Sequence, residues 1–139
     1  MPISQINTNS ISSSTGLTTP TFSGNTNMTG GAKYQVGGVT TNAIAWVNFN
    51  GSTAAIRTSY NVSSVTRTGT GIYTITFSTA TTDANYVLSS SATNYGGTGY
   101  LSVLGPTTTQ TTSAVQITVA NFSGTNTDVA YVTAAIFGN

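Results

Sequence analysis

The sequence predicts an all-β fold: an antiparallel β-sandwich or jelly-roll-like domain of about eight short strands. Short stretches rich in Val, Ile, Tyr and Thr alternate with turn-forming Gly, Asn and Ser, and no stretch takes a helical period. Hydrophobic residues make up 37% of the 139 residues, which argues for a folded core and against a disordered polar chain. We therefore expect a β-domain with one core.

Residues 1–41 differ from the rest because Ser, Thr, Asn and Gly dominate and apolar residues are isolated. Such a segment cannot build a core alone. We expect it to be an extended arm for anchoring or assembly, ordered by other chains; the alternative is a free tail. A short first strand is expected at Tyr34–Val36, and the β-sandwich domain over residues 42–139.

The stretch Ala43–Phe49 opens the series of strands with alternating side chains, so one face is expected to meet the core. Asn50–Gly51 follows and predicts a tight hairpin, because both positions of a type I′ turn need positive φ. Trp46, close to this turn, is expected to be a core residue.

The later strands are predicted from the same alternation and from Gly-rich breaks between them. Alternation is cleanest where Tyr, Ile, Phe or Val takes every second position. The expected strands are Ala54–Tyr60, Asn61–Thr68, Ile72–Ser78, Tyr86–Ser90, Tyr100–Leu104, Ala114–Ala120 and Val129–Phe137.

The last strand is apolar on both faces. In a small sandwich one face meets the core. The other is expected either to contact a second subunit or to be covered by a loop. The candidate inter-subunit contacts are Val129, Tyr131, Val132, Ala134 and Ile136.

One glycine-rich loop combines tyrosines with small polar residues. Tyrosine offers a flat stacking face, and its neighbours offer adaptable hydrogen bonding. A sugar ring can stack on such a surface, whereas the alternative is an ordinary flexible loop. The candidate receptor or glycan contact loop consists of Asn94, Tyr95, Gly96, Gly97, Thr98, Gly99 and Tyr100.

Charged residues make up only 4% of the chain, and histidine and cysteine are absent. Nucleophilic Ser–His and Cys–His pairs and the usual transition-metal sites therefore lack their side chains. We expect no enzyme and no cofactor, although a calcium site made from one Asp and backbone carbonyls stays open. The net charge of +1 gives no reason to expect nucleic acid, and no stretch is apolar enough for a membrane span.

The individual charges have simple expected roles. Asp83 and Asp128 stand beside predicted strands, where Asp commonly caps its own backbone. Arg67 is expected to be a solvated edge residue, although pairing with either Asp is the alternative. For Arg57 the two interpretations stay open. Lys33 falls in the predicted arm.

Several stretches resemble a module of tail fibre and other virion-surface proteins of tailed bacteriophages. The chain ending from Asp128 also looks like the ends of such proteins. The resemblance covers roughly residues 42–139 and is most specific in its first half. The stretches that carry it are Ala45-Trp46-Val47-Asn48-Phe49-Asn50-Gly51, Ala55-Ile56-Arg57, Tyr60 to Val65, Gly69 to Phe77, and Asp83-Ala84-Asn85-Tyr86-Val87.

This resemblance implies a virion structural protein of tail-fibre type that presents a trimeric β-domain for host attachment. Its expected partners are further copies of itself, other virion proteins through residues 1–41, and a host surface polysaccharide or receptor. Its expected place is the virion surface, after assembly in the host cytoplasm and release by lysis. The resemblance brings no catalytic residues. It also departs from the usual pattern, because such fibre proteins commonly have a long shaft before the module. A short spike, a fibre tip subunit or a shell ornament is therefore expected.

Two alternatives stay open at this stage. One is a capsid-decorating protein, of cement or head-fibre type, docked by its N-terminal arm. The other is a polysaccharide depolymerase, which would need both Asp83 and Asp128, because glycoside hydrolysis uses two carboxylates.

Overall fold

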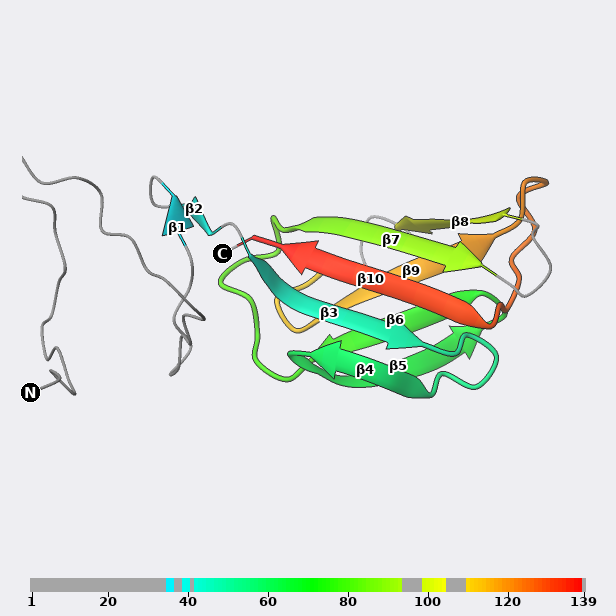
Figure 1. Cartoon of the computed structure of the whole chain (residues 1–139), viewed down its shortest axis with the longest axis horizontal. Helices are drawn as coiled ribbons and strands as arrows, with labels where there is room; N and C mark the ends of the chain where they lie inside the picture. The colour runs from blue at the N-terminus through cyan, green and yellow to red at the C-terminus, as the bar shows by residue number, and fades with distance from the viewer. Residues whose placement is uncertain (1–34, 37–38, 41, 94–98, 105–109, 139) are drawn as a thin grey trace, which may run out of the picture. The chain divides into compact units, whose positions relative to one another are not determined.

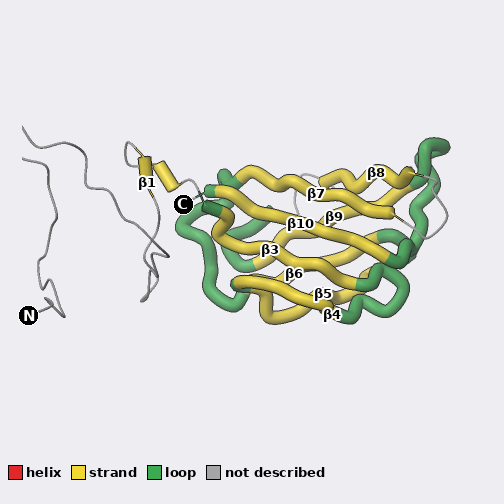
Figure 2. Tube along the Cα trace, viewed as in Figure 1, coloured by secondary structure: helices red, strands yellow, loops and turns green. Residues whose placement is uncertain are grey.

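The computed structural model describes residues 35–36, 39–40, 42–93, 99–104 and 110–138. The chain divides into two units, Met1–Ala32 and Lys33–Asn139, and every described residue belongs to the second. Most of the predicted arm therefore lies outside the described residues. The described part of the chain contains strands and no helix (Figure 2), which confirms the all-β class.

Two very short strands, β1 (Gln35–Val36) and β2 (Val39–Thr40), form an antiparallel pair. The remaining strands form one antiparallel ladder in the order β4-β3-β10-β7-β8-β9-β6-β5. They are β3 (Ala43–Phe49), β4 (Ile56–Tyr60), β5 (Val62–Gly69), β6 (Ile72–Phe77), β7 (Val87–Thr93), β8 (Gly99–Leu104), β9 (Ala114–Ala120) and β10 (Tyr131–Phe137).

The ladder folds over into two facing layers (Figure 1). The first layer contains β4, β3, β10 and β7, and the second contains β9, β6 and β5. Strand β8 joins them because it pairs with β7 on one side and β9 on the other. The predicted antiparallel sandwich of about eight strands is confirmed.

The core lies between the layers and follows the predicted alternation. Every second residue of β3, β6 and β9 is buried, as the sequence indicated. Phe49 of β3 meets Tyr73 of β6 edge to face across the core, with ring centroids 5.1 Å apart. The buried apolar residues are Ala45, Val47, Phe49, Val62, Tyr73, Ile75, Phe77, Tyr86, Ala92, Val115, Ile117, Val119, Val129, Val132, Ala134 and Ile136.

One asparagine joins the layers where the chain passes from β4 to β5. Asn61 has φ 54°, a left-handed conformation that Asn adopts more readily than most residues. Its side-chain amide donates to the carbonyls of Ile44 and Thr79, each at 3.1 Å, and its Oδ1 accepts the Thr79 N–H at 2.8 Å. This side chain therefore ties β3 to the segment after β6.

The predicted hairpin at Asn50–Gly51 is formed, since β3 pairs antiparallel with β4, but the predicted tight two-residue turn is wrong. Neither residue has positive φ; in this loop Ala54 does, with φ 57°. The loop runs from Asn50 to Ala55, closed by an Asn50 N–H bond to the Ala55 carbonyl at 2.9 Å. Gly51 is needed for close approach instead, since an added Cβ would lie 2.6 Å from the Val129 oxygen and 2.7 Å from the Tyr73 hydroxyl.

The last strand also needs a correction. Val132, Ala134 and Ile136 face the core, and Val129 is fully buried just before the strand begins. These four side chains therefore have almost no surface to offer a second subunit. Of the predicted inter-subunit residues, only Tyr131 lies on the outward, half-buried face.

Candidate binding surface

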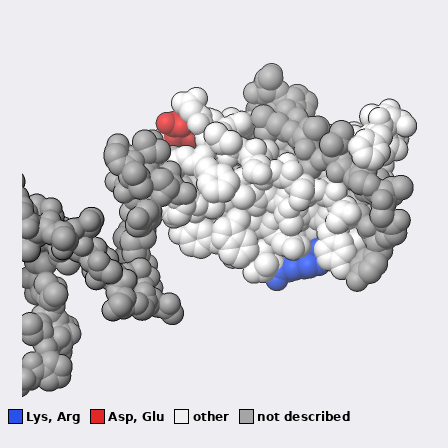
Figure 3. All heavy atoms as spheres, turned by 45° about the horizontal axis from the view of Figure 1, so that its top comes forward, with Lys and Arg blue, Asp and Glu red and all other residues white. Residues whose placement is uncertain are grey.

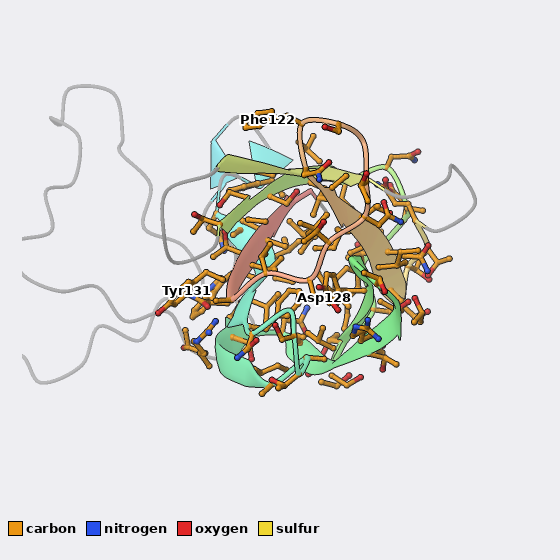
Figure 4. The ribbon with its side chains drawn as sticks, turned by 90° about the vertical axis from the view of Figure 1, so that its right-hand side faces the viewer. Phe122, Asp128 and Tyr131 are labelled. Carbon is orange, nitrogen blue, oxygen red and sulfur yellow. The ribbon has the colours of Figure 1, made fainter. Side chains whose placement is uncertain are left out.

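One cluster of polar side chains surrounds Asp128 at one end of the sandwich (Figure 4). Its carboxylate accepts hydrogen bonds from the Arg67 Nη2 at 2.7 Å, the Tyr73 hydroxyl at 2.8 Å and the Gly71 N–H at 2.8 Å. The Arg67 Nε adds a bond at 2.9 Å. Asp128, from the segment before β10, is thus bonded to β5, β6 and the turn between them.

These contacts set the ionisation of the cluster. Hydrogen bonds from Arg67 above all, and then from Gly71 and Tyr73, lower the pKa of Asp128 to about 2. Burial, and then the hydrogen bond to Asp128, raises the pKa of Tyr73 above its usual range. Asp128 is therefore charged and Tyr73 neutral over a wide pH range, so neither is poised to exchange protons near neutrality.

The structure confirms the role predicted for one of the two Asp residues and contradicts the role predicted for the other. Asp83 caps its own backbone as predicted, because its Oδ1 accepts the Asn85 N–H at 2.6 Å. Asp128 instead holds Arg67, so both the capping prediction for Asp128 and the solvated-edge prediction for Arg67 are wrong.

The two carboxylates also lie far apart. Strands β7 and β10 pair antiparallel, with Val87 opposite Phe137 and Tyr131 opposite Thr93. Asp83 precedes β7 and Asp128 precedes β10, so they stand at opposite ends of these strands, on the order of 20 Å apart. The two carboxylates of a glycosidase lie about 5–10 Å apart, so one copy of the chain does not bring this pair together.

Polar side chains also line part of the outer face of the first layer. The strand register places Trp46 between Tyr60 and Ala135, with Ser89 beyond Ala135. The neighbouring row runs Thr58, Asn48, Thr133 and Ser91. In these two rows the aromatic side chains Trp46 and Tyr60 stand over β3 and β4, whereas β10 and β7 contribute alanine and hydroxyl residues.

This size difference leaves a groove of about 380 Å³ in the outer face, which we call the outer groove. It contains no charged residue, and Figure 3 shows a largely uncharged face from an oblique direction. The residues that line it are Trp46, Val47, Asn48, Thr58, Ser89, Ser90, Ser91, Thr133, Ala134 and Ala135.

Arg57 stands at one end of the outer groove. A bulge opposite Asn48 and Phe49 leaves Arg57 outside the regular pairing of β3 with β4, and such bulges redirect side chains. Its guanidinium carbon lies 4.4 Å from the centre of the Tyr131 ring. Its Nη2 donates to the Ala130 carbonyl at 2.7 Å and its Nη1 to Asn48 Oδ1 at 3.2 Å. The cation is therefore held in one orientation.

Trp46 is not the core residue that the sequence predicted. It is 37% exposed, because it alternates with Ala45 and Val47, which take the inward positions. Strand alternation was a better signal than the position of Trp46 close to the predicted turn. The outer groove as a whole was missed, since it depends on β7 and β10 lying beside β3, and strand order was not readable from the sequence.

The predicted contact loop cannot be placed in full. Residues 94–98, including Tyr95, lie outside the described residues. Gly99 and Tyr100 begin β8, where they pair with Thr93 and Ala92. Elsewhere, Phe122 is 75% exposed at the edge of the loop between β9 and β10 (Figure 4).

Comparison with family models, with curated proteins and with solved structures finds no match for this chain. In the described residues, no set of acidic, histidine or cysteine side chains is arranged to hold a metal ion. The same residues include no helix with the length and apolarity of a membrane span.

Proposed function

We propose that the chain is a non-enzymatic virion structural protein of tail-fibre type, whose β-domain makes attachment contacts as a trimer. The observation that carries this proposal is the outer groove: an exposed, uncharged surface with an aromatic wall on a sandwich with a buried core. Uncharged surfaces with exposed aromatic side chains are typical of contact sites. The resemblance of residues 42–139 to phage fibre modules gives the biological setting.

The absence of catalysis is part of this proposal and has a physical basis. The sequence contains no histidine and no cysteine. Of its two acidic side chains, Asp128 is bonded to Arg67 and Asp83 forms a local turn. General acid–base catalysis needs a group whose pKa lies near the working pH, and Asp128 is held far below neutrality.

The location of the protein on the phage particle tests the proposed virion role. We expect antibody labelling and image reconstruction of the phage to place the protein at the tail tip, with purified protein reducing adsorption to host cells. Density on the capsid shell would replace this proposal with the capsid-decorating alternative. Absence from the particle would contradict both.

The oligomeric state tests the assembly. Light scattering on the full chain at micromolar concentration is expected to give three times the 14.2 kDa chain mass. A monomer under the same conditions would contradict a trimer that forms without other virion proteins.

A further inference from the structure

The outer groove has the chemistry of a glycan site rather than of a protein interface. Its wall is the indole of Trp46, and its floor is made of alanine and hydroxyl side chains. A sugar ring has an apolar face that stacks on aromatic rings and equatorial hydroxyls that exchange hydrogen bonds with Ser, Thr and Asn. A protein partner would more commonly need a continuous apolar centre.

Several polar groups around the groove have no partner within the described chain. Among the described residues, no hydrogen bond involves the Trp46 indole N–H or the hydroxyls of Thr58, Tyr60 and Ser89. Ser91 and Thr133 bond only with each other's strand, through an Oγ–Oγ1 contact of 2.8 Å. These groups face solvent and can form further hydrogen bonds with the hydroxyls of a ligand.

Arg57 adds a charge to this arrangement. Arg67–Asp128 is the salt bridge of the described residues, so Arg57 has no carboxylate partner there. A guanidinium carries five N–H donors, and the bonds to Asn48 and Ala130 leave some of them unused. Held over Tyr131 beside Asn48, Arg57 presents a fixed positive charge to the end of the groove.

We propose that the outer groove binds an acidic oligosaccharide. One sugar ring stacks on Trp46, its hydroxyls bond with Thr58, Ser89 and the Ser91–Thr133 pair, and a carboxylate or phosphate of a neighbouring sugar pairs with Arg57. This inference rests on the proposed attachment function and gives that function a ligand class and a site. It also moves the expected glycan contact from the tyrosine-bearing loop at 94–100 to the face of the first layer.

The test uses the full chain and acidic oligosaccharides of galacturonate, mannuronate or sialic acid, each beside its carboxyl methyl ester as the neutral counterpart. Trp46 is the sole tryptophan, so its fluorescence reports directly on the groove. We expect a saturable change with an acidic oligosaccharide and at least roughly tenfold weaker binding of its ester, equivalent to about 1.4 kcal/mol. The affinity is also expected to fall as salt rises.

Two variants locate the binding. Arg57→Gln is expected to reduce affinity for the acidic form to that for the ester, measured by calorimetry. Ser89→Tyr fills the groove from β7 without touching Arg57, and tyrosine suits an exposed strand position; it is expected to abolish binding while thermal unfolding stays unchanged.

Three results would overturn the inference: no saturable binding of any acidic oligosaccharide, equal affinity for acid and ester, or full affinity in Ser89→Tyr. The virion labelling described above separates this failure from failure of the proposed function. If the protein is found at the tail tip but does not bind acidic sugars, only the glycan inference fails. If the protein binds acidic sugars but is absent from the particle, the proposed virion role fails.

Discussion

The Asp128 cluster and the outer groove differ in whether their polar groups are hydrogen-bonded within the chain. In the cluster, the carboxylate is bonded to Arg67, Tyr73 and Gly71 within the chain. Around the groove, Trp46 and Ser89 lack such bonds in the described chain and face outward. One pair of the few charges of this chain joins β5, β6 and the segment before β10, whereas the lining of the outer groove is uncharged.

The largest expected effect lies in the turn that supplies a donor to the cluster. A Cβ on Gly71 would lie 2.4 Å from the Val119 oxygen at φ +68°, whereas Gly124 has φ +77° and nothing within 4 Å. Gly71→Ala is expected to lower the free energy of unfolding by about 3–5 kcal/mol, through a clash added to backbone strain. Gly124→Ala should cost about 1–2 kcal/mol from strain alone. Equal losses in denaturant unfolding would show that the turn is not tightly packed.

The next largest loss of stability is expected from a change to the carboxylate of Asp128. Asp128→Asn keeps the shape of the side chain but removes the charge that holds Arg67. We expect a loss of about 1–2 kcal/mol in unfolding free energy, at the modest end because solvent reaches the pair. Asp83→Asn is the control, since only a local turn depends on Asp83. A loss from Asp83→Asn as large as that from Asp128→Asn would contradict the special role of the cluster.

Unfolding at acid pH is a further test of what the Asp128 carboxylate contributes to stability. The folded pKa of Asp128 lies at about 2, below its ordinary value of 3.8. Its contribution to stability is therefore complete above about pH 4 and is lost as the pH falls toward 2. The wild-type unfolding free energy is expected to drop across this window, and Asp128→Asn should flatten the drop. An unchanged pH profile in the variant would assign the acid sensitivity to another group.

The smallest effect on stability is expected at the groove. Trp46 and Phe49 lie on the same strand, but Trp46 is 37% exposed and Phe49 is fully buried. Trp46→Ala should lower the unfolding free energy by about 1 kcal/mol, against about 3–5 kcal/mol for Phe49→Ala. Similar losses measured by thermal unfolding would mean that Trp46 is part of the core after all.

The strands were largely predictable because alternation is a local signal. β9 has the predicted bounds, Ala114–Ala120, and β6 differs from prediction by one residue. Trp46 shows where a second rule failed: its place close to the predicted turn suggested the core, whereas alternation with Ala45 and Val47 puts it on the outer face. Gly51 is a second example, because its close packing against Val129 outweighs the preference of Asn50–Gly51 for a tight turn.

The sequence offered pairing of Arg67 with an Asp only as an alternative and did not indicate the outer groove, because both sites depend on strand order. Arg67 and Asp128 are separated by 61 positions and meet only when the segment before β10 passes the β5–β6 turn. The outer groove needs residues of β7, β10, β3 and β4 side by side. Nothing in the local pattern of either strand says which neighbours it will have.

The most direct test measures unfolding free energy and oligosaccharide affinity together in two variants, Asp128→Asn and Trp46→Ala. If the cluster maintains the fold and the groove makes the contact, Asp128→Asn will lose stability and keep its affinity at neutral pH and low temperature. Trp46→Ala will keep most of its stability and lose its affinity. A folded Asp128→Asn that no longer binds, or a Trp46→Ala that binds as the wild type does, would contradict the separation of the two regions.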